Sequence, residues 1–115
     1  MYKITNITDN PKQQFSFPTD NGKLIKLKLY FISSQIGWFF DVEYDGIVST
    51  CHRVTNCPNI IREKKNIFPF GIACSVNDGQ EPWFVDDFLT GRATLYIVPY
   101  NEVLFIEKEV YGKVF

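Results

Sequence analysis

The sequence predicts an all-β domain, either a small antiparallel β-sandwich or a partly closed β-barrel, with at most one short helical turn. Apolar and polar residues alternate along several short segments, as they do in strands with one buried face. Turn residues rich in Asn, Asp and Gly separate these segments at short intervals. Aromatic residues, which favour strands, make up 17% of the 115 residues. Together these observations favour a fold of short strands joined by tight turns.

The first two expected strands flank a turn at Asp20-Asn21-Gly22. Residues 13–17 form a brief alternating segment that ends at a proline. Residues 23–32 follow, and their opposite face carries Tyr30 between lysines, so we expect this strand to be half exposed. Its apolar face consists of Ile25, Leu27, Leu29 and Phe31.

The sequence pattern over 37–46 predicts the first strand and the turn of an antiparallel hairpin. Four large side chains share one face of the strand over 37–44, and Phe39 begins the other face. The dipeptide Asp45-Gly46 suits a type I′ turn, which needs positive φ at both central residues. The chain then returns over 47–54. The inward face consists of Trp38, Phe40, Val42 and Tyr44.

The second half of the chain contains a long loop and two further strands. We expect a loop over 55–66, anchored by Ile60-Ile61, and then a strand over 68–76. Because Pro69 has no N–H to donate, this strand should begin irregularly or lie at a sheet edge. Residues 77–79 form a turn.

The C-terminal part is expected to be mostly extended. Residues 81–91 read as a loop with a single helical turn, residues 92–98 as a strand, and residues 102–115 as a last β-rich segment. The whole chain, 1–115, is therefore one domain with its core at about 12–100, and 101–115 is a β-rich extension available for contact with a partner.

Composition argues against several classes of partner. The formal net charge of −1 lacks the basic surplus of a nucleic-acid-binding domain. No apolar run is long enough for a membrane-spanning helix, and the first residues lack the apolar core of a secretory signal. We therefore expect neither nucleic acid nor membrane as a partner.

The residues that carry chemistry do not form a recognisable catalytic or metal site. His52 is the one histidine, and its neighbour Cys51 should face the other side of the same strand. Cys51, Cys57 and Cys74 lack metal-ligand spacing and read as small apolar residues, although a Cys51–Cys57 disulfide is geometrically conceivable. The adjacent acids Asp86-Asp87 read as a turn cap or as solvated. We expect no catalysis, cofactor or metal.

The more informative residues are the aromatic side chains outside the expected core. Tyr30 and Phe39 lie on outward faces of strands, and Trp83 and Phe84 lie in a loop. Soluble monomers rarely leave large aromatic patches in water, so we take these four as candidate contacts with a partner. The alternative is a sheet covered on both faces by its own chain.

A series of motifs along most of the chain resembles one family. The motifs are Gln13-Gln14-Phe15, Leu27-Lys28-Leu29, Gly37 to Val42, Asp45-Gly46, Asn59-Ile60-Ile61, Phe70-Gly71, Pro82, Asp86-Asp87-Phe88, Gly91 and Leu95 to Pro99. In this order they resemble the small baseplate plug family of contractile-tailed phages, known from cyanophage baseplates. The segments 62–66 and 101–115 depart from the shared pattern.

The resemblance implies a virion structural protein without catalysis, at the centre of the tail baseplate and attached to the hub near the end of the tail tube. Its implied partners are the hub, tail tube, spike or tape-measure proteins and further copies of itself, with assembly in the host cytoplasm. The alternative function is a stand-alone β-barrel module that binds a small apolar ligand. That module needs a cavity lined by Trp38, Phe40, Leu27 and Leu95.

Overall fold

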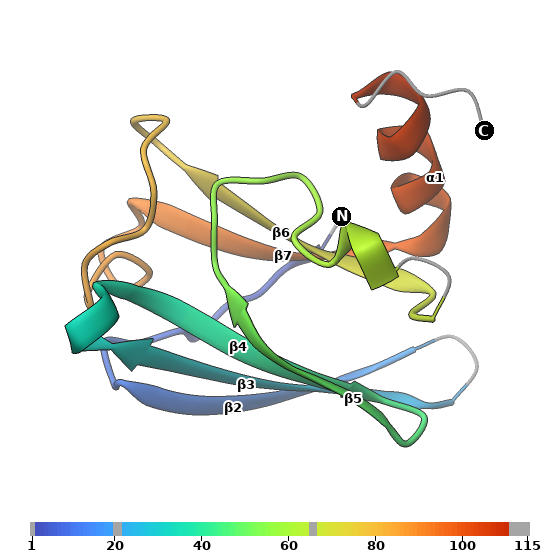
Figure 1. The fold of residues 1–115 in the computed structure, drawn as a ribbon, viewed down its shortest axis with the longest axis horizontal. Helices are drawn as coiled ribbons and strands as arrows, with labels where there is room; N and C mark the ends of the chain where they lie inside the picture. Colours follow the sequence, from blue (N-terminus) through green and yellow to red (C-terminus); the bar gives the residue numbers. More distant parts are fainter. Residues whose placement is uncertain (1, 20–21, 65–66, 111–115) are drawn as a thin grey trace.

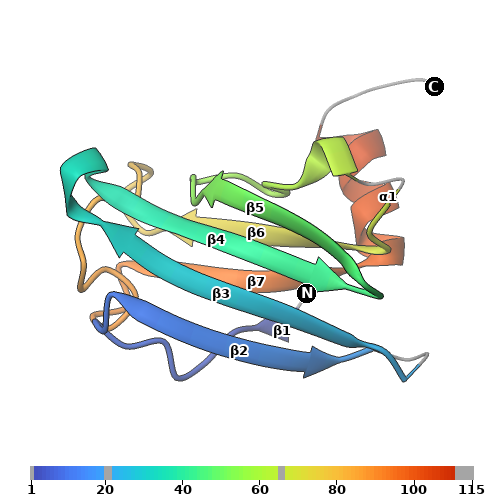
Figure 2. The same ribbon diagram turned by 60° about the horizontal axis from the view of Figure 1, so that its bottom comes forward.

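The computed structural model, which describes residues 2–19, 22–64 and 67–110, consists of two antiparallel sheets and a C-terminal helix (Figure 1). The sheets face each other and do not close into a barrel (Figure 2), so the sandwich expected from the sequence is confirmed. The four-stranded sheet has the order β2 (Lys12–Pro18), β3 (Leu24–Ile32), β4 (Gly37–Tyr44) and β5 (Ile47–Arg53). The three-stranded sheet has the order β1 (Tyr2–Lys3), β7 (Ala93–Pro99) and β6 (Phe70–Val76).

The β4–β5 hairpin has the predicted turn. Asp45 and Gly46 have φ values of 52° and 78°, as a type I′ turn requires. The register between β3 and β4 pairs Leu27 with Val42, so the apolar faces of the two strands coincide. The ladder between β4 and β5 shifts register between Phe40 and Val42, and Cys51 in β5 has a φ of 61°. The turn expected at residues 20–22 lies mostly outside the described residues.

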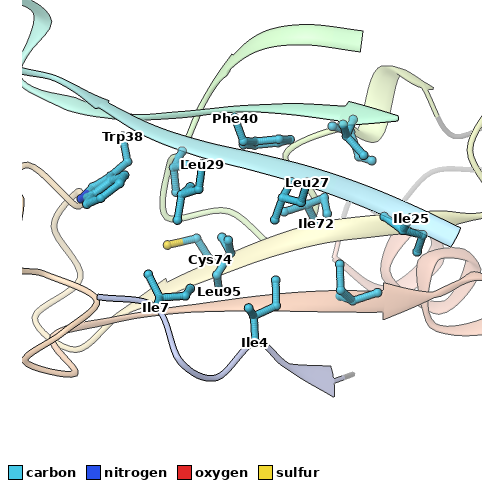
Figure 3. Packing of buried hydrophobic residues seen from close by; sticks show 14 of the residues in the cluster. Ile4, Ile7, Ile25, Leu27, Leu29, Trp38, Phe40, Ile72, Cys74 and Leu95 are labelled. Atoms are coloured by element: carbon cyan, nitrogen blue, oxygen red, sulfur yellow. The ribbon is translucent and has the colours of Figure 1, made fainter. Parts of the chain in front are cut away.

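The main core fills the space between the two sheets (Figure 3). The four side chains on the inward face of β4 are buried, as the alternation predicted, and those of β3 pack beside them. The opposite sheet contributes Ile72 and Leu95, both fully buried. Each such side chain removed from water stabilises the fold by roughly 1.5–3 kcal/mol.

The connection between β5 and β6 runs along the edge of the three-stranded sheet. Ile61 is buried, as expected of its anchoring role, and the connection includes a short 3-10 turn at Arg62–Lys64. The N–H of Ile60 donates to the carbonyl of Ile72 at 2.7 Å. β6 begins directly after Pro69, two residues later than expected, and lies at the edge of its sheet, which is one of the two alternatives expected of this strand. Residues 65 and 66 of the connection lie outside the described residues.

The expected β-rich extension is wrong, because residues Tyr100–Glu109 form helix α1. Val103 and Ile106 of α1 pack against Ala73 and Val98 on the outer face of β6 and β7. These helical positions are three residues apart and share one face. The four consecutive apolar residues from Val103 to Ile106 hid that spacing, since such a run also fits a buried strand.

The helix is further fixed by Glu107, which is buried and accepts a bond from Arg62 Nε at 2.6 Å. Figure 1 shows α1 beyond the three-stranded sheet, on the side away from the four-stranded one. No helix in the described parts of the chain has the length and apolar character needed to cross a membrane. Residues 111–115 of the expected extension lie outside the described residues.

Candidate interaction surface

Exposed apolar side chains gather at one end of the sandwich. Trp83, Phe84, Val85 and Leu89 all belong to the connection between β6 and β7, and Phe84 and Leu89 are more than half exposed. Ile36, 61% exposed, lies in the connection between β3 and β4. Figures 1 and 2 show both connections at the same end of the molecule. We call these five residues the apolar end surface.

Asp87 organises the loop that carries most of this surface. Its carboxylate is buried, and Oδ2 accepts the backbone N–H of Phe84 at 2.8 Å. The same oxygen accepts Arg92 Nη1 at 2.8 Å, and the backbone carbonyl of Asp87 accepts the N–H of Ala93 at 3.0 Å. One buried acid therefore connects the loop to the start of β7 with charge-assisted bonds.

Arg92 extends this network across the loop. Its guanidinium bonds the carboxylate of Asp78 at 3.2 Å and the carbonyl of Glu81 at 3.1 Å. It also lies 5.5 Å from the ring centroid of Phe84, within the range of a cation–π contact. The backbone N–H of Gln80 and then the Arg92 guanidinium hold the pKa of Asp78 below its usual value.

Beneath the loop lies Trp38, which joins it to the core. Its indole Nε1 donates to the carbonyl of Phe84 at 3.1 Å, and its ring meets Phe88 edge to face at 5.6 Å. Trp38 is fully buried, so the loop rests on a fixed support. The backbone of the loop at Phe84 is therefore held from both its N–H and its carbonyl by buried groups.

The four aromatic residues singled out in the sequence fall into two groups. Trp83 and Phe84 are exposed on the apolar end surface, as expected. Tyr30 and Phe39 stack on each other on the outer face of the four-stranded sheet, with ring centroids 6.2 Å apart. The expected exposure of Phe39 is wrong, because only 5% of it is exposed. The guanidinium of Arg53 also covers the Phe39 ring, with its central carbon 5.3 Å from the ring centroid.

Tyr30 is itself half-buried and well bonded. Its hydroxyl donates to Asp41 Oδ1 at 2.9 Å, and that oxygen also accepts the backbone N–H of Cys51 at the irregularity in β5. Burial, and then the bond to Asp41, raise the pKa of the Tyr30 hydroxyl above its ordinary value. Tyr30, Phe39 and Arg53 therefore cover one another on this face, whereas Lys26 and Lys28 of the same face of β3 are exposed.

Sequence reasoning did not identify Ile36, Val85 and Leu89 as part of the surface. Leu89 lies next to Phe88, which is buried, whereas Leu89 itself is 54% exposed. Ile36 could have been noticed in the sequence as a large apolar residue directly before Gly37 that belongs to neither of the two alternating segments around it, 23–32 and 37–44. Ile36 has a φ of 49°, an unusual conformation for a β-branched residue.

The residues of possible chemical interest occupy structural positions. His52 stacks on Phe40 at 5.2 Å and its Nε2 lies 2.6 Å from Ser49 Oγ. Burial, and then the charge of Lys64, lower the pKa of His52. Asp86 is exposed, whereas Asp87 is buried against Arg92. In the part of the chain that the structure describes, no three His, Cys, Asp or Glu side chains are grouped to hold a metal ion.

The side chains required by the apolar-ligand alternative belong to the packed core. Trp38, Phe40, Leu27 and Leu95 are all fully buried in one cluster (Figure 3). A hollow of about 430 Å³ is lined by β2 and β3 residues, and another of about 310 Å³ by the N-terminal segment and residues 88–95. Neither is lined by Trp38, Phe40 or Leu27.

Comparison with models of known protein families gives a match over most of the chain. A family model described as "Cyanophage baseplate Pam3 plug gp18" matches residues 1–101. The matched part contains both sheets, the apolar end surface and the first two residues of α1. No curated protein matches the chain in sequence.

Proposed function

Because the chain belongs to the family described as cyanophage baseplate Pam3 plug gp18, and is thus a phage baseplate plug structural protein, we propose that it occupies the centre of the baseplate. There it attaches to the hub near the end of the tail tube and acts by protein–protein contact without catalysis. The observation that carries this proposal is the family match over residues 1–101, which includes every strand of the sandwich.

The proposed partners are other baseplate and tail proteins: the hub, the tail tube, and the spike or tape-measure protein. Further copies of the chain complete a homo-oligomer, as closed symmetric assemblies usually require. The protein is assembled in the host cytoplasm and resides in the tail of the virion.

The apolar end surface is the proposed contact with the hub. It presents an exposed Trp and Phe, and buried aromatic side chains supply much of the binding energy at protein interfaces. The bonds of Asp87 and Arg92 hold the loop in place, so little order has to be gained on binding. Of the two aromatic pairs, Trp83 and Phe84 are therefore better suited to contact than Tyr30 and Phe39.

The test is co-purification with the hub protein encoded by the same phage, using a double variant of the surface. Phe84→Ser with Leu89→Ser removes two exposed apolar side chains and should weaken hub binding at least about tenfold. The chain offers a matched control on α1, where Phe105 is 64% and Leu104 is 52% exposed. Replacing these two by Ser changes the same residue types at similar exposure.

The two variants separate the possible outcomes. Loss of hub binding only in the Phe84/Leu89 variant supports the apolar end surface. Loss only in the Leu104/Phe105 variant would place the contact on α1 and contradict our assignment of the surface. Failure of the unmodified protein to bind the hub at all would contradict the proposed place in the baseplate. Circular dichroism of both variants verifies that the sandwich remains folded.

A further inference from the structure

Two cysteines lie directly opposite each other where the β5–β6 connection meets β6. Cys57 and Cys74 form an isolated antiparallel bridge. The N–H of Cys57 donates to the carbonyl of Cys74 at 3.1 Å, and the N–H of Cys74 donates to the carbonyl of Cys57 at 3.0 Å. This reciprocal exchange fixes the two residues in register.

Their register places the two thiols close together. Side chains of directly opposed residues in an antiparallel pair project to the same side of the sheet, with Cβ atoms about 4.5–5.5 Å apart. Hydrogen-bonded pairs have Cα atoms about 5.5 Å apart, which is near the commonest Cα separation of native disulfides. The structure has both residues as thiols. The Cβ atoms of a disulfide are about 3.5–4.5 Å apart, so the connection has to move about 1 Å toward β6 as the bond forms.

We propose that Cys57 and Cys74 form an oxidative cross-link site, at which a small-molecule disulfide converts the two thiols into a disulfide that ties the β5–β6 connection to β6. The inference rests on the chain's own residues and is independent of the proposed function. The third cysteine, Cys51, lies exposed in β5 and is not part of the bridge.

The reaction is thiol–disulfide exchange in two steps. The thiolate of Cys57, which is half-buried, attacks one sulfur of the reagent and displaces the first small thiolate. The thiolate of Cys74 then attacks the Cys57 sulfur of the mixed disulfide and displaces the second. Two protein thiols are oxidised, one reagent disulfide is reduced to two thiols, and the two protons from the cysteines end on those products.

The order of the steps follows from burial. Cys74 is 3% exposed and points into the core (Figure 3), whereas Cys57 is more accessible. Burial, and then the charge of Glu81, raise the pKa of Cys74 to about 12, so Cys74 is seldom a thiolate and reacts with a reagent in solution more slowly than an accessible thiol. Cys57 is therefore the first residue to react and Cys74 the resolving residue.

The cross-link would secure an edge strand. β6 is the outer strand of its sheet, and the connection covers that edge through the Cys57 bridge and the bond from Ile60 to Ile72. An uncovered edge is a template for pairing with another chain. Joining Cys57 to Cys74 fixes the β5–β6 connection against the edge of β6. The disulfide also closes a loop in the unfolded chain, which stabilises the folded state.

The chain is well suited to a direct test, because its three cysteines fall on three different tryptic peptides, 29–53, 54–62 and 66–92. The folded protein is incubated with glutathione disulfide, blocked with an alkylating reagent, digested without reduction and analysed by mass spectrometry. We expect peptides 54–62 and 66–92 to appear as one linked species that lacks two hydrogen atoms and is separated by dithiothreitol. The oxidised protein should melt about 10 °C higher than the reduced one.

Two variants identify the residues involved. Cys51→Ser should leave the linked species and the rise in melting temperature unchanged, whereas Cys57→Ser should abolish both. The proposal is overturned if peptide 29–53 carries the link, or if glutathione stays on Cys57 with Cys74 alkylated after denaturation. It is equally overturned if all three cysteines remain reduced, or if the linked protein melts no higher than the reduced one.

Discussion

The bonds of Asp87 lead to a sharp prediction about the loop that carries the apolar end surface. Asp87→Asn keeps the size of the side chain but removes the negative charge. In the native protein Oδ2 of this buried acid accepts both the N–H of Phe84 and Arg92 Nη1 at 2.8 Å. Asn has one oxygen and an NH2 group, and that NH2 group cannot accept a bond from a donor. The substitution therefore converts both charge-assisted bonds to weaker neutral ones or breaks one of them.

The expected loss of stability in Asp87→Asn depends on the hydrogen-bond acceptors that Arg92 keeps. A hydrogen bond to a charged group contributes about 1.5–3 kcal/mol, and breaking a fully buried ion pair costs about 3–5 kcal/mol. Arg92, however, is 21% exposed and keeps Asp78 and the carbonyl of Glu81 as acceptors. We therefore expect a loss of about 2–3 kcal/mol in the free energy of unfolding. For a chain of this size that corresponds to a fall of about 10 °C in melting temperature.

The assay is urea unfolding followed by circular dichroism, together with thermal melting. The adjacent residue provides the control, since Asp86 is exposed and Asp86→Asn should change the free energy of unfolding by less than about 0.5 kcal/mol. The Asp87 variant should also accelerate amide exchange at Phe84. Equal stability of the two variants would refute the reasoning that the buried acid holds the loop.

Three further predictions concern other parts of the molecule. Gly71→Ala should cost about 1–3 kcal/mol, because a Cβ there would lie 2.7 Å from Oδ1 of the buried Asn59; urea unfolding measures the loss. Glu107→Gln should weaken the attachment of α1 by about 1–3 kcal/mol through the bond from Arg62, as measured by amide exchange in the helix. In reduced protein Cys74 should lower the free energy of unfolding by about 3 kcal/mol from pH 9 to 12, measured as the difference between the native chain and Cys74→Val, because burial raises its pKa to about 12 while the unfolded chain loses that proton near pH 9.

Each of these has a control within the chain. Gly46→Ala meets no neighbouring atom but has a φ of 78°, so it should cost only the backbone strain of about 1–2 kcal/mol. Glu109→Gln changes an exposed acid of the same helix and should leave amide exchange unaltered. Cys74→Val should remove the Cys74 part of the alkaline decline and keep the part due to Tyr30, whose pKa is also raised by burial. An alkaline decline in Cys74→Val as large as in the native chain would contradict the role of Cys74. Unchanged amide exchange after Glu107→Gln would contradict the role of Glu107 in holding α1.

Local sequence pattern was sufficient for most of the sandwich. Alternation identified the buried faces of β3 and β4, and Asp45-Gly46 identified the hairpin because few other dipeptides tolerate two positive φ values. Pro69 marked the start of an edge strand because it cannot donate a bond. In these places the local chemistry and the tertiary structure favour the same conformation.

The features that escaped prediction depend on distant partners. Alternation shows which face Phe39 occupies, but its burial depends on Tyr30 and Arg53, which come from neighbouring strands. Adjacent acids at 86 and 87 look alike in sequence, and only the approach of Arg92 makes one of them a buried member of a network. Helix α1 was missed because its inward positions are recognisable only once the outer face of β6 and β7 is known to receive them.

The most direct test of the central claim is cryo-electron microscopy of tails purified from the phage that encodes this chain. Our account predicts density for the two-sheet sandwich at the centre of the baseplate, with the apolar end surface of Ile36, Trp83, Phe84, Val85 and Leu89 buried against the hub. A tail without this protein, or a baseplate in which those five side chains face solvent, would contradict it.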